Sequence, residues 1–326
     1  DPAVEQRFGA SLALLGDRLL VGAYWDRSQG PVDSGAAFLF ELSDGVWTHS
    51  HSFYSPNPTI SGHFGLSVAL AEGGKRALIG EPGAVQQFLD QGAGIVFDEI
   101  GGNWSFTARL EVPGAFALAG YGSSVAIEGD SIVLGGPGDA VDGTFQAGAA
   151  AIFTLGAQWT FSERLGAFQP QEQAGFGQSV SLQNGRIAIS APQEMVGSQV
   201  AAGAIYVRRG AGLLERLVAT DARAGDRLGT QLALCGNRLL AGAPGVDISS
   251  QFSRGALYLW ADTVSQWQPL PRFLTPDGGA LEGLGISVAC DGEMGFAGAP
   301  FKAAVNPQEG RAYSVVIGSL FADGYE

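Results

Sequence analysis

The fold is decided by the stretch Phe64-Gly65-Leu66-Ser67-Val68-Ala69-Leu70, which is followed by Leu78-Ile79-Gly80-Glu81-Pro82. The same pattern occurs six times along the chain. The copies begin at Phe8, Phe64, Tyr121, Phe176, Leu228 and Leu284, so one repeat is 52 to 57 residues long. A regular period of this length indicates a repeat architecture, in which each unit buries its apolar face against its neighbours.

Each repeat has the pattern of four short β-strands. In the first strand, Ser67 and Ala69 alternate with Val68 and Leu70, and this period of two is typical of a strand. A short polar turn follows, and the second strand is almost entirely apolar, as in a strand packed on both faces. The third strand opens with a Gly-Ala pair in five copies. The fourth carries a tryptophan in four copies, for which we expect a packing role: Trp47, Trp104, Trp159 and Trp267.

Four-stranded sheets repeated about an axis make a β-propeller, and six units lie within the usual range of about four to eight blades. The small Ser and Ala face of the first strand favours this arrangement, because blades crowd most closely near the axis. We therefore predict an all-β, six-bladed propeller of antiparallel blades, closed into a single domain over residues 1–326. An open solenoid is the alternative, and the lack of polar capping repeats argues against it.

The sixth repeat has no recognisable fourth strand. Its third strand is expected at Ala312–Val316, and no tryptophan follows in Ile317–Glu326. We expect the last blade to be completed by Ile317–Phe321, by the N-terminal Pro2–Gln6 or by a partner chain, unless the native chain is longer.

Charge excludes several classes of partner. The chain has 18 basic and 32 acidic residues and a formal net charge of −14. This charge repels nucleic acid and anionic lipid, so neither partner is expected. No run of about 18 apolar residues is present, and we expect no membrane insertion. The first seven residues do not resemble a signal peptide and are typical of a processed, mature chain.

The two cysteines occupy corresponding ends of the first strands in repeats five and six. Because these repeats are neighbours, Cys235 and Cys290 can form a disulfide. Two buried free thiols are the other interpretation, since Cys290 stands where other repeats have a core residue such as Leu14 or Leu70.

The six copies resemble the FG-GAP repeat, which is the repeat of integrin α-subunit propellers and of many bacterial secreted or surface proteins. The resemblance covers residues 8 to about 316 and is carried by motifs such as Leu228-Gly229, followed by Gly242-Ala243-Pro244. It implies a binding or adhesion scaffold outside the cytoplasm, whose partners are proteins or glycans.

One feature departs from this family. Several members carry an Asp-x-Asp-x-Asp-Gly calcium loop between the first and second strands. Here that position holds only short turns such as Gly16-Asp17, with at most one or two carboxylates each. A hard cation needs about six to eight oxygen ligands, so we predict no calcium site of this type and no other cofactor.

The long loops after the second and fourth strands are expected at one end of the propeller, where recognition usually occurs. Tyr24 and Trp25 replace the proline of the other repeats and are candidates for exposed aromatic contacts. Carboxylates of these loops can bind an ion or a sugar hydroxyl, although such residues more often form turns or solvate a loop. The candidates are Asp26, Asp33, Asp139, Asp142 and Asp247.

Three phenylalanines in these loops, Phe88, Phe145 and Phe252, resemble a ring of exposed aromatics for glycan stacking. However, Phe145 and Phe252 stand three residues before the glycine of the third strand, where Val32 and Val200 also stand. We therefore expect a buried packing role for these two residues.

No catalytic or metal centre is predicted. His49 and His51 alternate along a fourth strand and should share a face, but they have no third ligand, and His63 lies far along the chain. The sequence has no nucleophile elbow, no phosphate-binding loop with lysine and no His-Glu-x-x-His motif. Loops from different blades can still bring carboxylates together.

These observations lead to one functional hypothesis and its alternatives. We expect a non-catalytic, extracytoplasmic module for binding, adhesion or assembly, which recognises a protein or surface polymer through the loops of one face. One alternative is a carbohydrate-binding propeller, or an enzyme with its site at the channel mouth. Another is a structural subunit of a larger surface assembly.

Overall fold

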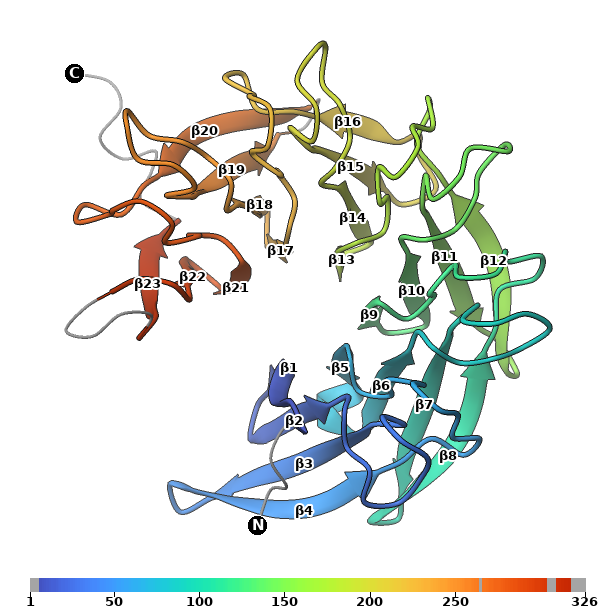
Figure 1. The fold of residues 1–326 in the computed structure, drawn as a ribbon. Coiled ribbons are helices and arrows are strands. Elements are labelled where there is room, and N and C mark those ends of the chain that lie inside the picture. The colour runs from blue at the N-terminus through green and yellow to red at the C-terminus, as the bar shows by residue number, and fades with distance from the viewer. Residues whose placement is uncertain (1–5, 264–265, 304–308, 318–326) are drawn as a thin grey trace. The chain divides into compact units, whose positions relative to one another are not determined.

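The computed structural model describes residues 6–263, 266–303 and 309–317 (Figure 1). In these ranges the regular structure is β-strand, apart from one 3-10 turn, η1, at Glu72–Gly74. The strands form six antiparallel sheets, five of four strands and one of three. The prediction of an all-β protein with six propeller blades is therefore confirmed.

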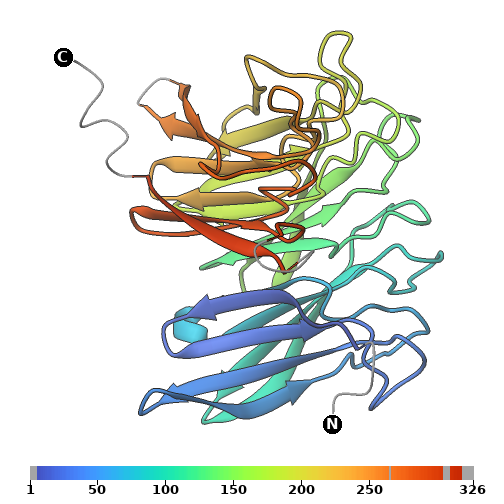
Figure 2. The ribbon, with the colours of Figure 1, turned by 60° about the vertical axis from the view of Figure 1, so that its left-hand side comes forward.

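The chain divides into two compact units, residues 1–172 and 173–326, each with three blades. In the first unit each sheet follows chain order, which Figure 2 shows clearly for β1–β4. Its strands are β1 (Phe8–Leu15), β2 (Arg18–Ala23), β3 (Ala36–Ser43), β4 (Val46–Phe53), β5 (Val68–Ala71), β6 (Arg76–Glu81), β7 (Ala93–Ile100), β8 (Asn103–Leu110), β9 (Ser124–Glu128), β10 (Ser131–Gly136), β11 (Ala149–Leu155) and β12 (Trp159–Leu165).

The second unit repeats this arrangement with a shorter last sheet. Its strands are β13 (Val180–Gln183), β14 (Arg186–Ala191), β15 (Ala204–Arg209), β16 (Glu215–Leu217), β17 (Leu232–Cys235), β18 (Arg238–Ala243), β19 (Ala256–Asp262), β20 (Trp267–Phe273), β21 (Ser287–Asp291), β22 (Met294–Ala299) and β23 (Arg311–Val316).

The first two strands of a blade form the expected tight hairpin. In the first blade, Leu15 pairs with Arg18, so the turn has two residues. In the sixth blade the turn is Gly292-Glu293, one residue later than the sequence suggested, because Asp291 is still paired. The apolar second strands lie in the interior, as predicted for strands packed on both faces.

Glycine at the start of the third strand lets successive blades approach closely. Gly35 forms a parallel bridge with Phe64, and a Cβ at Gly35 would lie 2.1 Å from the Phe64 carbonyl oxygen. The small Ser and Ala residues on one face of the first strand also allow this close approach. The Ser11 hydroxyl donates a 2.8 Å hydrogen bond to the carbonyl of Gly65 in the next blade. A larger side chain at either place would separate the sheets.

Three of the four fourth-strand tryptophans pack between blades, as expected, whereas Trp47 is exposed. The guanidinium carbon of Arg18 lies 5.8 Å from the ring centre of Trp104, which belongs to the next blade. Arg76 and Trp159 repeat this contact at 5.5 Å. In the second unit Arg209 covers Trp267 at 5.7 Å. Each pair adds a cation–π attraction to the apolar packing.

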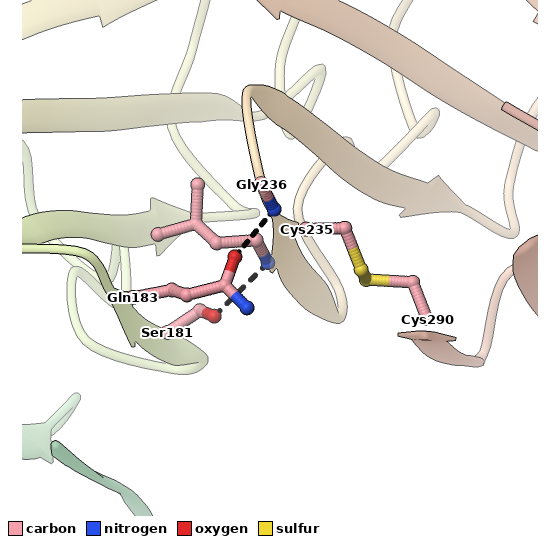
Figure 3. Close-up of a disulfide and its surroundings, with 6 residues drawn as sticks. Ser181, Gln183, Cys235, Gly236 and Cys290 are labelled. Atoms are coloured by element: carbon pink, nitrogen blue, oxygen red, sulfur yellow. Dashed lines mark hydrogen bonds between the residues drawn. A yellow bond between two sulfur atoms is a disulfide. The ribbon is translucent and has the colours of Figure 1, made fainter. Parts of the chain in front are cut away.

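Cys235 and Cys290 form a disulfide between β17 and β21, with their Cα atoms 6.1 Å apart (Figure 3). On the other side of β17, Ser181 and Gln183 accept hydrogen bonds from the backbone amides of Leu234 and Gly236 (Figure 3). The inner strands of the three blades in this unit are therefore joined one to the next.

Within the described residues the sixth blade has the three strands β21, β22 and β23. Ile317 donates a 2.7 Å hydrogen bond to the Glu293 carbonyl, so it continues the pairing of the third strand instead of beginning a fourth. The other candidate segments, Pro2–Glu5 and residues 318–321, lie outside the described residues.

Candidate functional site

Asp26 and Asp33 of the first-blade loop form local contacts. Asp26 is buried, and its Oδ1 accepts hydrogen bonds from the Ser28 amide at 2.8 Å and the Ser28 hydroxyl at 2.5 Å. Asp33 is half-buried, and its Oδ1 accepts a 3.0 Å hydrogen bond from Nε of Arg27. The turn-forming interpretation therefore describes Asp26, while Asp33 remains at the surface within an ion pair.

The two aromatic candidates of this loop are half-buried rather than fully exposed. The Arg7 guanidinium carbon lies 4.5 Å from the centre of the Trp25 ring. The Tyr24 ring packs edge-on against Trp25 and against His63, with ring centres 5.6 and 5.7 Å apart. These contacts fix the orientation of both rings.

The structure separates the two carboxylates of the third-blade loop. Asp139 is fully buried, and it accepts a hydrogen bond from the Tyr121 hydroxyl and forms a 2.7 Å ion pair with Arg164. Burial raises the pKa of Tyr121, and the Asp139 charge raises it further. Asp142 is exposed, in a turn between the bridged residues Val141 and Thr144. Of the two, only Asp142 is open to a ligand.

Asp139 occupies a position that is buried in all six blades. At this position the backbone carbonyl accepts a hydrogen bond of 2.9 to 3.0 Å from the glycine that opens the third strand. The loop therefore turns inward, whatever the side chain. The six residues are Asp26, Ala84, Asp139, Glu194, Val246 and Lys302. In five repeats this residue stands two positions after the repeat's proline, and that constant place is the sequence signal of its burial.

In four blades an arginine of the outer strand pairs with a carboxylate, and two of these carboxylates, Asp139 and Glu194, belong to the buried loop position. Glu194, for example, accepts a hydrogen bond from the Tyr206 hydroxyl at 2.8 Å and pairs with Arg216 at 2.7 Å. The four pairs are Arg109 with Glu81 at the end of β6, Arg164 with Asp139, Arg216 with Glu194, and Arg272 with the exposed Asp221. In the third and fourth blades the pair holds the loop to the outer strand.

Glu81 is the most perturbed of these carboxylates. It is fully buried, and burial raises its pKa to about 7, although the 3.2 Å contact with Arg109 opposes the shift. Arg109 also donates a 2.7 Å hydrogen bond to the exposed Glu111. The arginine therefore remains ion-paired when Glu81 is protonated.

Asp247 lies at a small acidic cleft in the second unit. Its Oδ1 accepts a 2.8 Å hydrogen bond from the Ser253 amide. The cleft of about 220 Å³ is also lined by Asp221, Asp226 and Arg272. Burial raises the pKa of Asp226, and the charges of Asp221 and Asp247 act in the same direction. Across the described ranges, no three His, Cys, Asp or Glu side chains are placed to hold a metal ion together.

The expectation that Phe145 and Phe252 are buried is wrong. Their side chains are 55% and 68% exposed. The residue after each has a left-handed backbone, with φ of 50° at Gln146 and 47° at Ser253, which turns the preceding side chain outward. The first five blades all expose an apolar residue at this position: Val32, Leu89, Phe145, Val200 and Phe252. We call these residues the loop-tip residues.

The backbone beneath the loop-tip residues is held in place. The Val32 carbonyl accepts a 2.9 Å hydrogen bond from the Ser61 amide, and the Leu89 carbonyl accepts one from Leu118 at the same distance. Phe252 makes the equivalent contact with Leu281 at 2.7 Å. The exposed side chains are thus presented on loops of fixed conformation.

A cleft lies in the first unit, between the loop of residues 85–91 and the loop of residues 111–117. It has a volume of about 1210 Å³, with the exposed rings of Phe88 and Phe116 among its lining residues. The buried amide of Gln91 joins the two loops. Its oxygen accepts a hydrogen bond from the Phe88 amide at 2.6 Å, and its nitrogen donates to the Ala115 carbonyl at 2.5 Å. The cleft is therefore preformed.

The histidines lie apart from this cleft, and the expectation that His49 and His51 share a face is wrong. A bulge in the pairing of β3 with β4 separates them. The His49 ring packs against Phe40, whereas the His51 ring packs against Phe53 at 4.7 Å between ring centres. Burial lowers the pKa of His51, so the uncharged ring is favoured.

The fold and the loops together define a β-propeller protein with a preformed cleft and exposed apolar loop tips. The family model described as the FG-GAP repeat matches residues 1–40 and 212–260. The match over these two stretches agrees with the resemblance that the motif copies indicated, and the fold is consistent with the FG-GAP propellers. No curated protein matches this chain. Across the described ranges, no helix has the length and hydrophobicity to cross a bilayer.

Proposed function

We propose that this protein is a non-catalytic, extracytoplasmic binding module, which recognises a protein or surface polymer through the loops that follow the second and fourth strands. One observation carries the proposal: an apolar side chain is exposed at the same loop position in each of the first five blades. Exposed apolar side chains on a fixed backbone are costly to maintain in water, and they are typical of contact surfaces.

The cleft between Phe88 and Phe116 is the proposed centre of recognition in the first unit. Its two loops are already joined by Gln91, so little conformational entropy is lost when a ligand binds. The net charge of −14 disfavours polyanionic partners. We therefore place a neutral or basic protein segment, or a neutral polymer, in this cleft.

The same proposal includes an extracytoplasmic location, no catalytic role and no cofactor. A disulfide is typical of proteins that fold outside the cytoplasm, and proteins with FG-GAP repeats are usually extracellular. Glu81, Asp139 and Glu194 are buried beside arginines and closed off from a substrate, so we assign none of them a catalytic role. The short turns between first and second strands lack the oxygens for a calcium site, so we propose no cofactor.

The test compares two phenylalanine sites of the same blade. Phe88→Ala combined with Phe116→Ala should weaken binding at least about tenfold on arrays of extracellular proteins and surface polysaccharides. Phe106→Ala is the matched control, because Phe106 is similarly exposed but lies on the outer strand β8. Equal losses of binding for both variants would contradict the proposal.

Binding confined to polysaccharides would favour a carbohydrate-binding propeller, and turnover of glycosides or esters would favour an enzyme.

A further inference from the structure

The cleft between Phe88 and Phe116 belongs entirely to the first unit, since its lining residues all lie between Asn57 and Ala117. Phe88 and Phe116 are 50% and 53% exposed, so both rings are accessible to a ligand. Phe88 is one of the loop phenylalanines whose sequence positions indicated glycan stacking. Phe116 comes from the loop that follows β8. Each wall of the cleft therefore carries an exposed aromatic ring.

Two buried side chains hold the backbone of these phenylalanines. The Phe88 amide donates a 2.6 Å hydrogen bond to the side-chain oxygen of Gln91, and the Phe116 amide donates one of 3.2 Å to Oδ1 of Asp139. Gln91 is 3% exposed and Asp139 is fully buried. The positions from which both rings extend are therefore set before a ligand arrives, which lowers the entropy lost on binding.

Uncharged amide side chains lie beside the rings. Asn57 and Gln87 line the cleft and are exposed, and among the described residues neither amide side chain has a hydrogen-bond partner. Each amide offers two N–H donors and an oxygen acceptor. A hydroxyl group both donates and accepts, so these two side chains are suited to ligands that carry several hydroxyls.

The charged side chains of the cleft are already paired. Of the described residues that line it, Arg109 and Glu111 carry charge, and Nε of Arg109 donates a 2.7 Å hydrogen bond to Glu111. Arg109 also pairs with the buried Glu81 at 3.2 Å. A charged ligand would have to compete with these ion pairs, so the lining favours a ligand without net charge.

The backbone of the cleft does not suit an extended peptide. The strand β6 ends at Glu81 and β7 begins at Ala93, while β8 ends at Leu110 and β9 begins at Ser124. Both walls are therefore loops, and they offer no open strand edge for a peptide to join by backbone pairing. The volume of about 1210 Å³ exceeds the range of about 300–1,000 Å³ that is usual for one small molecule, so several units of a polymer fit.

We propose that this cleft binds a neutral polysaccharide of pyranose sugars, with Phe88 and Phe116 packed against the C–H faces of sugar rings and with Asn57 and Gln87 hydrogen-bonded to their hydroxyls. The inference rests on the proposed function and narrows its partner to one chemical class. A neutral polysaccharide combines apolar ring faces with many uncharged hydroxyls, and these two features match the rings and the amides of the cleft.

Isothermal titration calorimetry of the 326-residue chain tests the proposal. The neutral probes are cellohexaose, laminarihexaose, maltohexaose and mannohexaose, and oligogalacturonate is the matched anionic probe. At least one neutral probe should bind with a dissociation constant below about 1 mM. Oligogalacturonate should bind at least about tenfold more weakly. The affinity for the neutral probe should change less than about twofold as salt is raised, because no ion pair forms with the ligand.

Variants of the cleft locate the binding site. Phe88→Ala combined with Phe116→Ala should weaken binding of the neutral probe at least about tenfold, and Asn57→Ala combined with Gln87→Ala should do the same. Phe88→Tyr combined with Phe116→Tyr keeps both rings and should retain the affinity within about threefold. Phe106→Ala is again the control and should bind as the wild type does. Circular dichroism confirms that each variant is folded.

The outcomes separate this inference from the proposed function. A folded wild-type chain that binds none of the neutral probes would overturn the assignment of a polysaccharide. The proposed function would still stand if a protein partner found on the arrays were lost in the Phe88→Ala, Phe116→Ala variant. Binding of a neutral probe that all the alanine variants of the cleft retain would overturn both, because the ligand would then bind elsewhere.

Discussion

The hydroxyl of Tyr121 donates a 2.5 Å hydrogen bond to Oδ2 of Asp139, and both side chains are fully buried. Tyr121 begins the third repeat, and Asp139 lies in the loop 18 residues later. Arg164 reaches the same carboxylate from the outer strand β12. One buried acid therefore joins the start of the blade, its loop and its last strand.

Removing this acid should be strongly destabilising. Asp139→Ala leaves the Arg164 charge and the Tyr121 hydroxyl without their buried partner, and we expect a loss of about 3–5 kcal/mol in the free energy of unfolding. Asp142→Asn is the control, because Asp142 is exposed in the same loop and asparagine tolerates its left-handed φ of 51°, so stability should change by less than about 0.5 kcal/mol. Urea denaturation measures both; similar losses would show that the Asp139 cluster is not a clamp.

Glu81 should make stability depend on pH in an unusual direction. Its pKa is raised from 4.5 to about 7 in the folded protein, so the native state binds more protons than the unfolded state between these values. The contribution of Glu81 to the free energy of unfolding is fully present below pH 4.5 and is lost as the pH rises through 7. Relative to Glu81→Gln, the wild type should lose about 3 kcal/mol across this range.

Denaturant unfolding at several pH values from 4 to 8 provides the measurement. Glu111→Gln is the matched control, because Glu111 contacts the same arginine from an exposed position. The difference in the free energy of unfolding between Glu111→Gln and the wild type should vary little over these pH values. Parallel stability curves for wild type and Glu81→Gln would show that the Glu81 pKa is not raised.

Gly122 should not tolerate a side chain. Its φ is +92°, and an added Cβ would lie 2.3 Å from the Ala93 carbonyl oxygen of the preceding blade. Gly122→Ala should therefore cost more than about 3 kcal/mol or prevent folding. Gly102 has a similar φ of +84°, and no described atom lies within 4 Å of its added Cβ, so Gly102→Ala should cost about 1 kcal/mol. Equal melting temperatures for the two variants would contradict a close approach of the blades.

The disulfide between Cys235 and Cys290 should contribute about 2–4 kcal/mol, because it restricts the unfolded chain across a separation of 55 residues. Reduction should lower the melting temperature of the wild type. A Cys235→Ser, Cys290→Ser variant should melt lower at the outset and not respond to the reductant. The idea fails if reduced and oxidised wild-type protein melt at the same temperature.

Sequence patterns predicted the blades well because their causes are local. The alternation of Ser67 and Ala69 with Val68 and Leu70 depends only on which side of a strand each residue occupies. Trp104, Trp159 and Trp267 were also assigned correctly to packing between blades, since a residue at a constant place in a repeat meets the same neighbours. The single domain over 1–326 and the partners stay predictions.

The candidate site was harder to predict because it depends on long-range contacts. The burial of Asp139 requires Arg164 and Tyr121, which come from two other strands. The exposure of Phe145 and Phe252 depends on the left-handed residue that follows each, and only glycine marks such a backbone clearly in a sequence. The position of His49 and His51 depended in the same way on a bulge.

Local sequence patterns were enough to show that this protein consists of repeated four-stranded sheets whose motifs resemble the FG-GAP repeat, because strand periodicity, turn chemistry and glycine placement act within a few residues. Contacts between distant segments of the folded chain settle which charged loop residues are buried, which apolar residues face water, and that Phe88 and Phe116 lie along one cleft. Those outcomes depend on the depth at which a side chain lies and on the charges brought beside it from distant strands, and a linear pattern contains neither quantity.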